Sequence, residues 1–182
     1  YQNNQRSFTL KVLKSKAKVL CFTDNLSWEF SFLKRFLSSQ KYLECSFVIY
    51  GKGQKPLTPD FPKEEKELEQ FDLLISVNSS ADFFQSKEEK LNNLILKKGK
   101  SILLLLGPEA VTLSKISSNL KFLPLNLKST APIVMNFNLK LTQEGKYHSI
   151  TNLVSAETDN SKIWSSLPPF WGLVQIDTVY PE

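Results

Sequence analysis

The chain has 182 residues, of which 41% are hydrophobic, 12% aromatic and 23% charged. This composition excludes a disordered chain and supplies enough apolar side chain for one folded domain, with or without an appendage. The net charge of +5 comes from a basic arm, since the acid-free first twenty residues contain Arg6, Lys11, Lys14, Lys16 and Lys18. No basic face interleaved with aromatic side chains follows, so we expect no nucleic-acid partner.

Hydrophobic periodicity predicts alternating strands and helices along most of the chain. Strands are predicted at residues 7–14, 17–22, 43–50, 72–77 and 100–106, and helices at 28–39, 64–69, 86–98 and 109–117. Beyond these the pattern loosens and predicts strands at 137–141 and 173–179 and a helix at 158–167. The pattern predicts a three-layer, flavodoxin-like α/β fold, with a mostly parallel sheet, helices on both faces and a stray N-terminal strand ahead of it.

The helix at 28–39 carries the most informative charged residue, Glu29. Six apolar side chains share a broad arc that we expect to face the core: Trp28, Phe30, Phe32, Leu33, Phe36 and Leu37. Glu29 lies near the middle of this arc, where a carboxylate needs a partner. It serves either the free N–H groups of the first helical turn, capped by Ser27, or a crevice beside Asp24.

Ligands of open α/β sheets bind beyond the carboxyl ends of the strands. The strand ends predicted here supply the following crevice candidates: Asp24, Asn25, Trp28, Glu29, Asn78, Ser79, Gly107, Pro108 and Glu109. No catalytic residue is assigned; the candidates for acid and base groups are Asp24, Glu29 and the single histidine, His148.

The sequence gives little support for a metal site, a cofactor-binding motif or a cysteine–histidine dyad. One histidine cannot form a multi-histidine metal centre, and the sequence holds no Walker loop, no G-x-G-x-x-G and no G-x-S-x-G, so we expect no metal and no cofactor. Cys21 lies inside a predicted strand, which disfavours a dyad with His148. Cys21 and Cys45 are predicted to be buried thiols, although neighbouring parallel strands could bring them close enough to bond.

The string KVLCFTDNLSWEFSFLKRFL, from Lys18 to Leu37, resembles the first strand and helix of the class I glutamine amidotransferase-like domain. This domain occurs in large bacterial membrane proteins that often also carry von Willebrand factor A modules. Trp28-Glu29 carries the resemblance, and FDLLISVNSS, LILKKGKSILLLLGPEAV, FNLKLTQEGKYHSITNL and SLPPFWGLVQI continue it in order. It implies a domain over residues 16–182, truncated at its C-terminus, preceded by residues 1–15 as the last strand of an upstream β domain.

The resemblance implies the fold without the family's chemistry. The nucleophilic cysteine would follow the strand at 100–106, where this chain has Gly107-Pro108-Glu109, and His148 is followed by Ser149 instead of a glutamate. The chain is therefore expected to be a non-catalytic binding or assembly module on the extracytoplasmic side of a bacterial membrane. Its anchor would lie outside this chain, and its partners would be other domains of the same polypeptide or envelope proteins.

Two alternatives remain open at this point. One is a hydrolase or carbohydrate-acting enzyme that uses Asp24, Glu29 and His148 as acid and base groups in the crevice. The other is adhesion of the basic arm to anionic surfaces.

Overall fold

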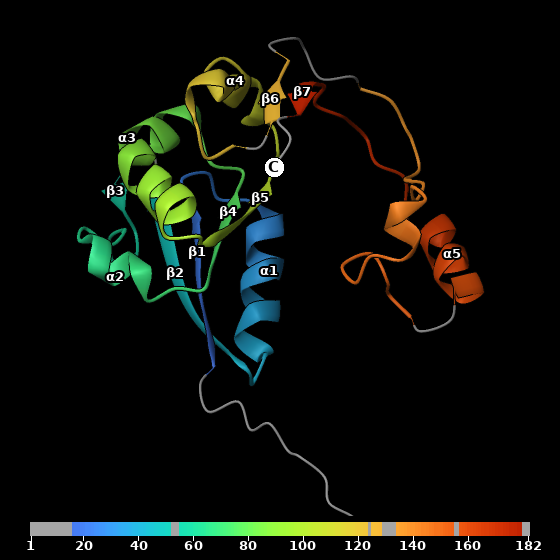
Figure 1. Ribbon diagram of the computed structural model, residues 1–182, viewed down its shortest axis with the longest axis horizontal. Coiled ribbons are helices and arrows are strands. Elements are labelled where there is room, and N and C mark those ends of the chain that lie inside the picture. Colours follow the sequence, from blue (N-terminus) through green and yellow to red (C-terminus); the bar gives the residue numbers. More distant parts are fainter. Residues whose placement is uncertain (1–15, 52–54, 124, 129–133, 155–156, 180–182) are drawn as a thin grey trace, which may run out of the picture.

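A computed structural model describes residues 16–51, 55–123, 125–128, 134–154 and 157–179. Its centre is a five-stranded sheet of order β3-β2-β1-β4-β5 (Figure 1). Four strands run parallel: β1 (Ala17–Thr23), β2 (Leu43–Gly51), β4 (Leu73–Val77) and β5 (Ser101–Leu105). The short β3 (Lys55–Pro56), which the sequence did not predict, pairs antiparallel with the end of β2. The strand predicted at 7–14 lies outside the described residues.

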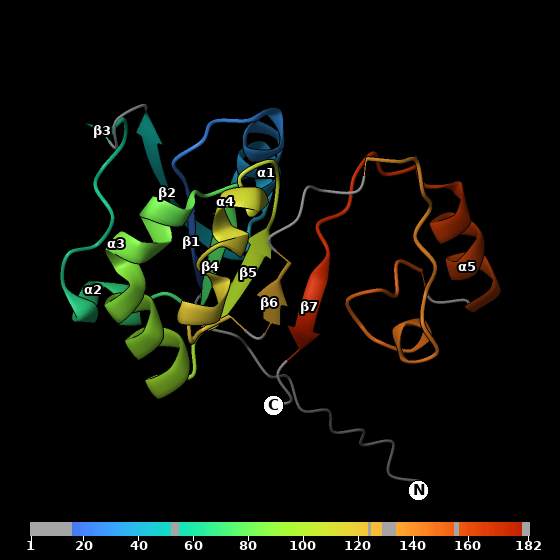
Figure 2. The ribbon, with the colours of Figure 1, turned by 90° about the horizontal axis from the view of Figure 1, so that it is seen from above.

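Helices cover both faces of the sheet, as Figure 2 shows from above. One face carries α1 (Trp28–Ser39), and the other carries α2 (Glu65–Glu69), α3 (Ala81–Asn92) and α4 (Ala110–Ser114). A π-helical turn (Asn93–Lys97) extends α3, and a 3-10 turn (Ser117–Asn119) follows α4. The predicted α/β class, with a mostly parallel sheet and helices on both faces, is confirmed, and the strand order is consistent with a flavodoxin-like layout.

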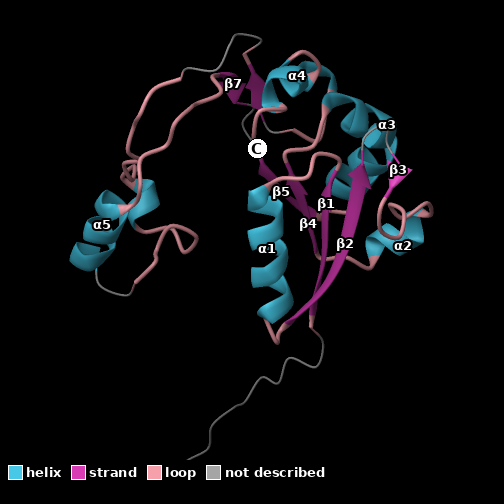
Figure 3. Ribbon diagram, turned by 180° about the vertical axis from the view of Figure 1, so that it is seen from behind, coloured by secondary structure: helices cyan, strands magenta, loops and turns pink. Residues whose placement is uncertain are grey.

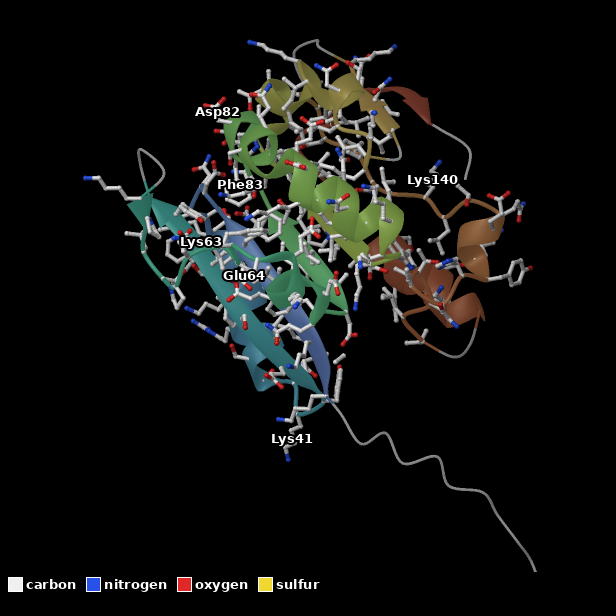
Figure 4. All side chains as sticks on the ribbon, turned by 60° about the vertical axis from the view of Figure 1, so that its left-hand side comes forward. Lys41, Lys63, Glu64, Asp82, Phe83 and Lys140 are labelled. Atoms are coloured by element: carbon white, nitrogen blue, oxygen red, sulfur yellow. The ribbon has the colours of Figure 1, made fainter. Side chains whose placement is uncertain are left out.

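The larger of two hydrophobic cores lies between the sheet and the α3 side. Phe22 of β1 stacks on Phe83 of α3 with ring centroids 5.3 Å apart, and Phe61 meets Phe22 edge to face at 5.4 Å. Figure 4 labels Phe83 among these packed side chains, whereas Lys41 lies at the far end of the sheet. The smaller core joins α1 to the opposite face of the sheet, chiefly through Phe30.

The chain beyond α4 departs from the predicted pattern. Strands β6 (Leu125–Leu127) and β7 (Ile176–Val179) form a separate antiparallel pair. Between them, the described residues 134–154 and 157–175 form a lobe that contains a 3-10 turn (Glu144–Lys146) and α5 (Glu157–Ser166). The lobe stands apart from the sheet, beyond the edge formed by β5 (Figures 1 and 3).

Two predictions about elements are wrong. The predicted strand at 137–141 is reduced to a single bridge between Phe137 and Phe170, because no neighbouring strand pairs with the rest of it among the described residues. The helix predicted to begin at residue 86 begins at Ala81, because the Ser80 hydroxyl accepts a hydrogen bond from Phe83 N at 3.2 Å and caps the helix earlier.

Both cysteines are free thiols, so the bonded alternative is wrong. Cys21 is paired across β1 and β2 with Phe47, whereas Cys45 is paired with Val19. The two cysteines are therefore offset by two positions along the strands, which separates them by about 7 Å along the strand direction in addition to the spacing between strands.

Candidate functional site

The carboxyl ends of β1 and β4 lie side by side, and Asp24 joins the loops that follow them. The Asp24 carboxylate accepts hydrogen bonds from Ser80 N at 2.8 Å and from the Ser80 hydroxyl. Ser80 is at the same time the N-cap of α3. A side chain in the first loop therefore holds the start of a helix that begins 56 residues later.

A second group of polar residues connects the loops after β1, β4 and β5. The Asn25 amide donates a hydrogen bond to Glu109 Oε1 at 2.9 Å, and Glu109 N donates to Asn78 Oδ1 at 3.0 Å. Asn78 adopts a left-handed backbone conformation, with φ of 47°, and its N–H donates to Leu105 O at 2.8 Å. Three loops are thus held together by the residues that sequence analysis placed at the crevice.

Gly107 permits this close approach because it has no side chain. A Cβ atom at position 107 would lie 2.5 Å from Asn78 Oδ1, well inside van der Waals contact. Pro108 follows as an exposed residue, and Ser79 is buried with its hydroxyl accepting from Ser76 Oγ at 2.8 Å. The polar groups at this edge of the sheet therefore bond to one another.

Glu29 accepts hydrogen bonds in the first turn of α1, which is the first of its two predicted roles. Its side chain is exposed, and hydrogen bonds from its own backbone N–H and from the Ser27 hydroxyl lower the pKa of the carboxyl group. Both bonds favour the charged form, which also interacts favourably with the helix N-terminus.

The prediction that the whole apolar arc of α1 faces the core is wrong. Trp28, Phe32 and Phe36 are 80%, 63% and 59% exposed, whereas Phe30 and Leu37 are buried. The arc is wider than the strip of helix that touches the sheet, so only part of it is covered. The crevice candidate Trp28 consequently lies in solvent at the start of α1.

His148 lies in the lobe, where its Nδ1 atom accepts a hydrogen bond from Ile150 N at 3.2 Å and its side chain is exposed. Within the described part of the chain, Asp24, Glu29 and His148 form hydrogen bonds with other residues or with their own backbone, and not with one another. The structure thus gathers Asp24, Asn25, Asn78, Ser79, Gly107 and Glu109 at one edge of the sheet, and leaves His148 on the separate lobe.

Cys21 has the properties of a core side chain. It is fully buried in β1, and burial, with a smaller contribution from Cys45, raises its pKa to about 12. Burial also raises the pKa of Cys45. At neutral pH both side chains are therefore protonated thiols, and the thiolate that nucleophilic catalysis needs is scarce.

The end of β2 holds a buried polar pair that the sequence did not predict. The Tyr50 hydroxyl is hydrogen-bonded to Asp60 and accepts from Phe61 N at 3.1 Å. Burial and the Asp60 carboxylate raise the pKa of Tyr50 to about 12. No periodicity in the sequence marks this pair, because Asp60 lies in a loop.

The sequence also did not predict an apolar surface, here named the α1–β5 surface and defined by Phe36, Leu103 and Leu105. The register pairs Ile75 with Leu103 and Val77 with Leu105, which places both leucines on the face that α1 covers. Ile75 and Val77 are buried under α1, but Leu103 and Leu105 are 44% and 38% exposed.

One flank of α1 faces these leucines, whereas Trp28 and Phe32 lie on the side of the helix that is turned away from the buried Phe30 and Leu37. Lys34 of α1 lies over the Phe47 ring of β2, 5.4 Å from its centroid, so this flank of the helix points toward β2. Phe36 lies on the opposite flank, which therefore points toward β4 and β5. A parallel sheet normally has both faces covered, so this surface is an uncovered part of an otherwise ordinary core.

Among the residues that the structure describes, no group of three or more metal-ligating side chains is found, and no helix is long and apolar enough to span a bilayer. Comparison of the chain with protein-family models, with curated proteins and with solved structures finds no match. The amidotransferase-like assignment therefore stays a prediction from the sequence.

Proposed function

We propose that this chain is a non-catalytic binding and assembly module with an amidotransferase-like, flavodoxin-like fold, belonging to a larger bacterial envelope protein. The observation that carries the proposal is the mutual hydrogen bonding at the carboxyl edge of the sheet. Asp24 is engaged by Ser80, and Asn25, Asn78 and Glu109 are linked to each other. A ligand at this edge would have to replace hydrogen bonds that these side chains already make with one another.

The state of the cysteines supports the same proposal. Glutamine hydrolysis on this fold needs a thiolate on an exposed turn. The turn after β5 begins with Gly107 and Pro108, and Cys21 is a buried thiol whose pKa is raised to about 12. The membrane location and the partners of the larger protein are carried by the resemblance alone.

The uncovered α1–β5 surface supports a binding role. Apolar side chains left uncovered on a sheet face are suited to packing against another polypeptide. A module without a reaction of its own can act by holding such a partner.

The experiment is an activity screen of the purified chain. Ammonia release from glutamine, together with hydrolysis of chromogenic esters and glycosides, should equal the buffer rate. An active chain whose rate is lost in Cys21→Ala or His148→Ala would overturn the proposal. A rate that requires Asp24, Glu29 and His148 together would establish the alternative enzyme.

A further inference from the structure

We propose that an apolar groove between β5 and β6 binds the hydrocarbon chain of a single-chain carboxylate, with Lys100 holding the carboxylate at the mouth of the groove. The groove lies on the α3 side of the sheet, so it uses the face of β5 opposite to the α1–β5 surface. This inference adds a small ligand to the proposed binding role and does not depend on the absence of catalysis. It is carried by the lining, the walls, the length and the charge of the groove.

The lining of the groove is apolar throughout its described residues. Ile102 and Leu104 of β5 face Leu125 and Leu127 of β6 across a volume of about 410 Å³, and the other described residues that line it are also aliphatic or aromatic. Ligand pockets commonly hold about 300–1,000 Å³. Because these side chains offer a ligand no hydrogen bond, the groove suits a hydrocarbon and not a polar molecule.

The walls of the groove are part of the folded core. Leu113 and Phe122, which also line it, are only 1% and 4% exposed, so the groove reaches down to the larger core. The β6 wall lies beside β5 and α4 (Figure 2), and Leu127 N donates a hydrogen bond to Ser117 Oγ at 3.1 Å. A groove that is already formed costs little to reorganise when an apolar ligand enters it.

The length of the groove fits one extended hydrocarbon chain. Its lining follows β5 from Ile102 to Leu106, a span of about 13 Å at the rise of a parallel strand. An extended saturated chain of roughly ten carbons has this length. The groove therefore takes a chain of medium length and leaves one end of it at the start of β5.

Lys100 supplies a cation at that end. It lies two positions before Ile102, so it continues the alternation of β5 on the groove face, and its N–H donates to Leu94 O at 3.1 Å. Among the described residues the half-buried Lys100 takes part in no ion pair, and the nearby Asp72 carboxylate accepts from Lys18 N at 2.8 Å. A free ammonium group beside an apolar groove favours a ligand with an anionic head.

Apolar polypeptide is the competing occupant. The lobe stands beyond the edge formed by β5 (Figure 1) and exposes apolar side chains of its own, among them Ile150 and Trp171. If the lobe or a segment of another protein filled the groove, a small carboxylate would find no room there. Binding of a monomeric carboxylate to the full chain therefore separates the two kinds of occupant.

The first measurement is isothermal titration calorimetry of the full chain with octanoate, decanoate and tetradecanoate, each below its critical micelle concentration. The dissociation constant should fall about fourfold for each methylene up to the length of the groove, and no further beyond it. Leu104→Trp should fill the groove and weaken decanoate binding about tenfold or more. Leu103→Trp is the matched control, because Leu103 is 44% exposed on the other face of the same strand, and it should leave binding unchanged.

The second measurement tests the head group, and it holds even if Leu104→Trp fails to fold. Lys100→Glu should weaken binding of decanoate about tenfold or more and leave binding of the uncharged decanol unchanged. Lys55→Glu is its control, because it makes the same change of charge in β3, at the opposite edge of the sheet, and it should affect neither ligand.

Four results would overturn the proposal. They are no binding of decanoate, binding that Leu104→Trp leaves unchanged, an equal loss of decanoate and decanol in Lys100→Glu, and binding to phosphatidylglycerol vesicles without binding to monomeric carboxylates. The last would indicate a membrane surface in place of a groove ligand. All four leave the non-catalytic role standing, because the activity screen alone decides it.

Discussion

Cys21 shows how a single buried residue makes stability depend on pH. Its pKa is raised from the ordinary 9.0 to about 12 because burial penalises the thiolate. The folded chain therefore keeps a proton that the unfolded chain loses. The stabilisation is fully present below pH 9 and is lost as the pH rises toward 12.

We expect the free energy of unfolding to fall between pH 9 and 12, with Cys21 contributing up to about 1.4 kcal/mol per pH unit. Denaturant titrations across this range measure the slope. Cys21→Ala should flatten it, and the remaining slope belongs to other groups such as Tyr50, whose pKa is also raised to about 12. Equal slopes in wild type and Cys21→Ala would contradict the assignment.

Gly107→Ala should destabilise the chain by about 1–3 kcal/mol, because the new Cβ would lie 2.5 Å from Asn78 Oδ1. Thermal or chemical unfolding measures the loss. In an Asn78→Gly background the amide is absent, so the cost of Gly107→Ala should shrink. A cost that stays the same in this background would show that another contact is responsible.

At the scale of elements, the start of α3 is held more firmly than the start of α1. Ser80 caps α3 and also bonds to Asp24 in another loop, whereas the Ser27 hydroxyl accepts from Phe30 N at 3.3 Å and otherwise bonds to the exposed Glu29 of the same helix. Only the cap of α3 joins two strand ends. We therefore expect the two helices to respond differently to loss of their caps.

Ser80→Ala should cost about 2 kcal/mol and Ser27→Ala about 1 kcal/mol in unfolding free energy, since a cap is worth about 1 kcal/mol and the second bond of Ser27, to Glu29, is exposed to solvent. Urea unfolding of the two matched variants checks the order. Equal losses would mean that the Asp24 bond contributes nothing to stability.

The sequence predicted the ends of α1 correctly but not the side that it buries. Ser27 and the period of the apolar residues determine where the helix lies, and these signals are local. The buried side depends on how many helices share the sheet face, which no local period records. The strand predicted around Phe137 failed for a related reason, because alternation can form a strand only where a partner strand is available.

The candidate site was predictable in part. The rule for open α/β sheets places Asp24, Asn25, Asn78 and Glu109 together, because it depends only on strand order. Their pairing could not be predicted, since it depends on side-chain geometry between segments far apart in the chain. The predicted strand at 7–14 and the division at residue 15 keep the status of predictions, because they fall on residues outside the described part.

At the scale of the whole molecule, the sheet and the lobe differ in how much apolar side chain holds them. The sheet has a core on each face, whereas the lobe relies on a few bonds such as Trp164 Nε1 donating to Thr151 O at 2.8 Å. Regions with small apolar cores open at lower free energy than the rest. We therefore expect the lobe to open without the sheet.

Native-state hydrogen exchange should show the Leu153 amide, which donates to Asn160 Oδ1 at 2.8 Å, exchanging well before the amide of Leu20 in β1. Trp164→Phe removes the bond to Thr151 and should speed exchange in the lobe only. Trp171→Phe, at a position that is 72% exposed, is the matched control and should change neither. Faster exchange at Leu20 in Trp164→Phe would show that the two parts unfold as one.

The bond between Asp24 and Ser80 also limits which ligands this fold can take. A helix N-terminus at the strand ends attracts anions, and many α/β proteins bind the phosphate of a nucleotide there. In this chain a carboxylate of the protein itself accepts from the N-terminal N–H of Ser80. Asp24 acts as a resident anion, so a phosphate group approaching α3 would meet a like charge and a donor that is already engaged.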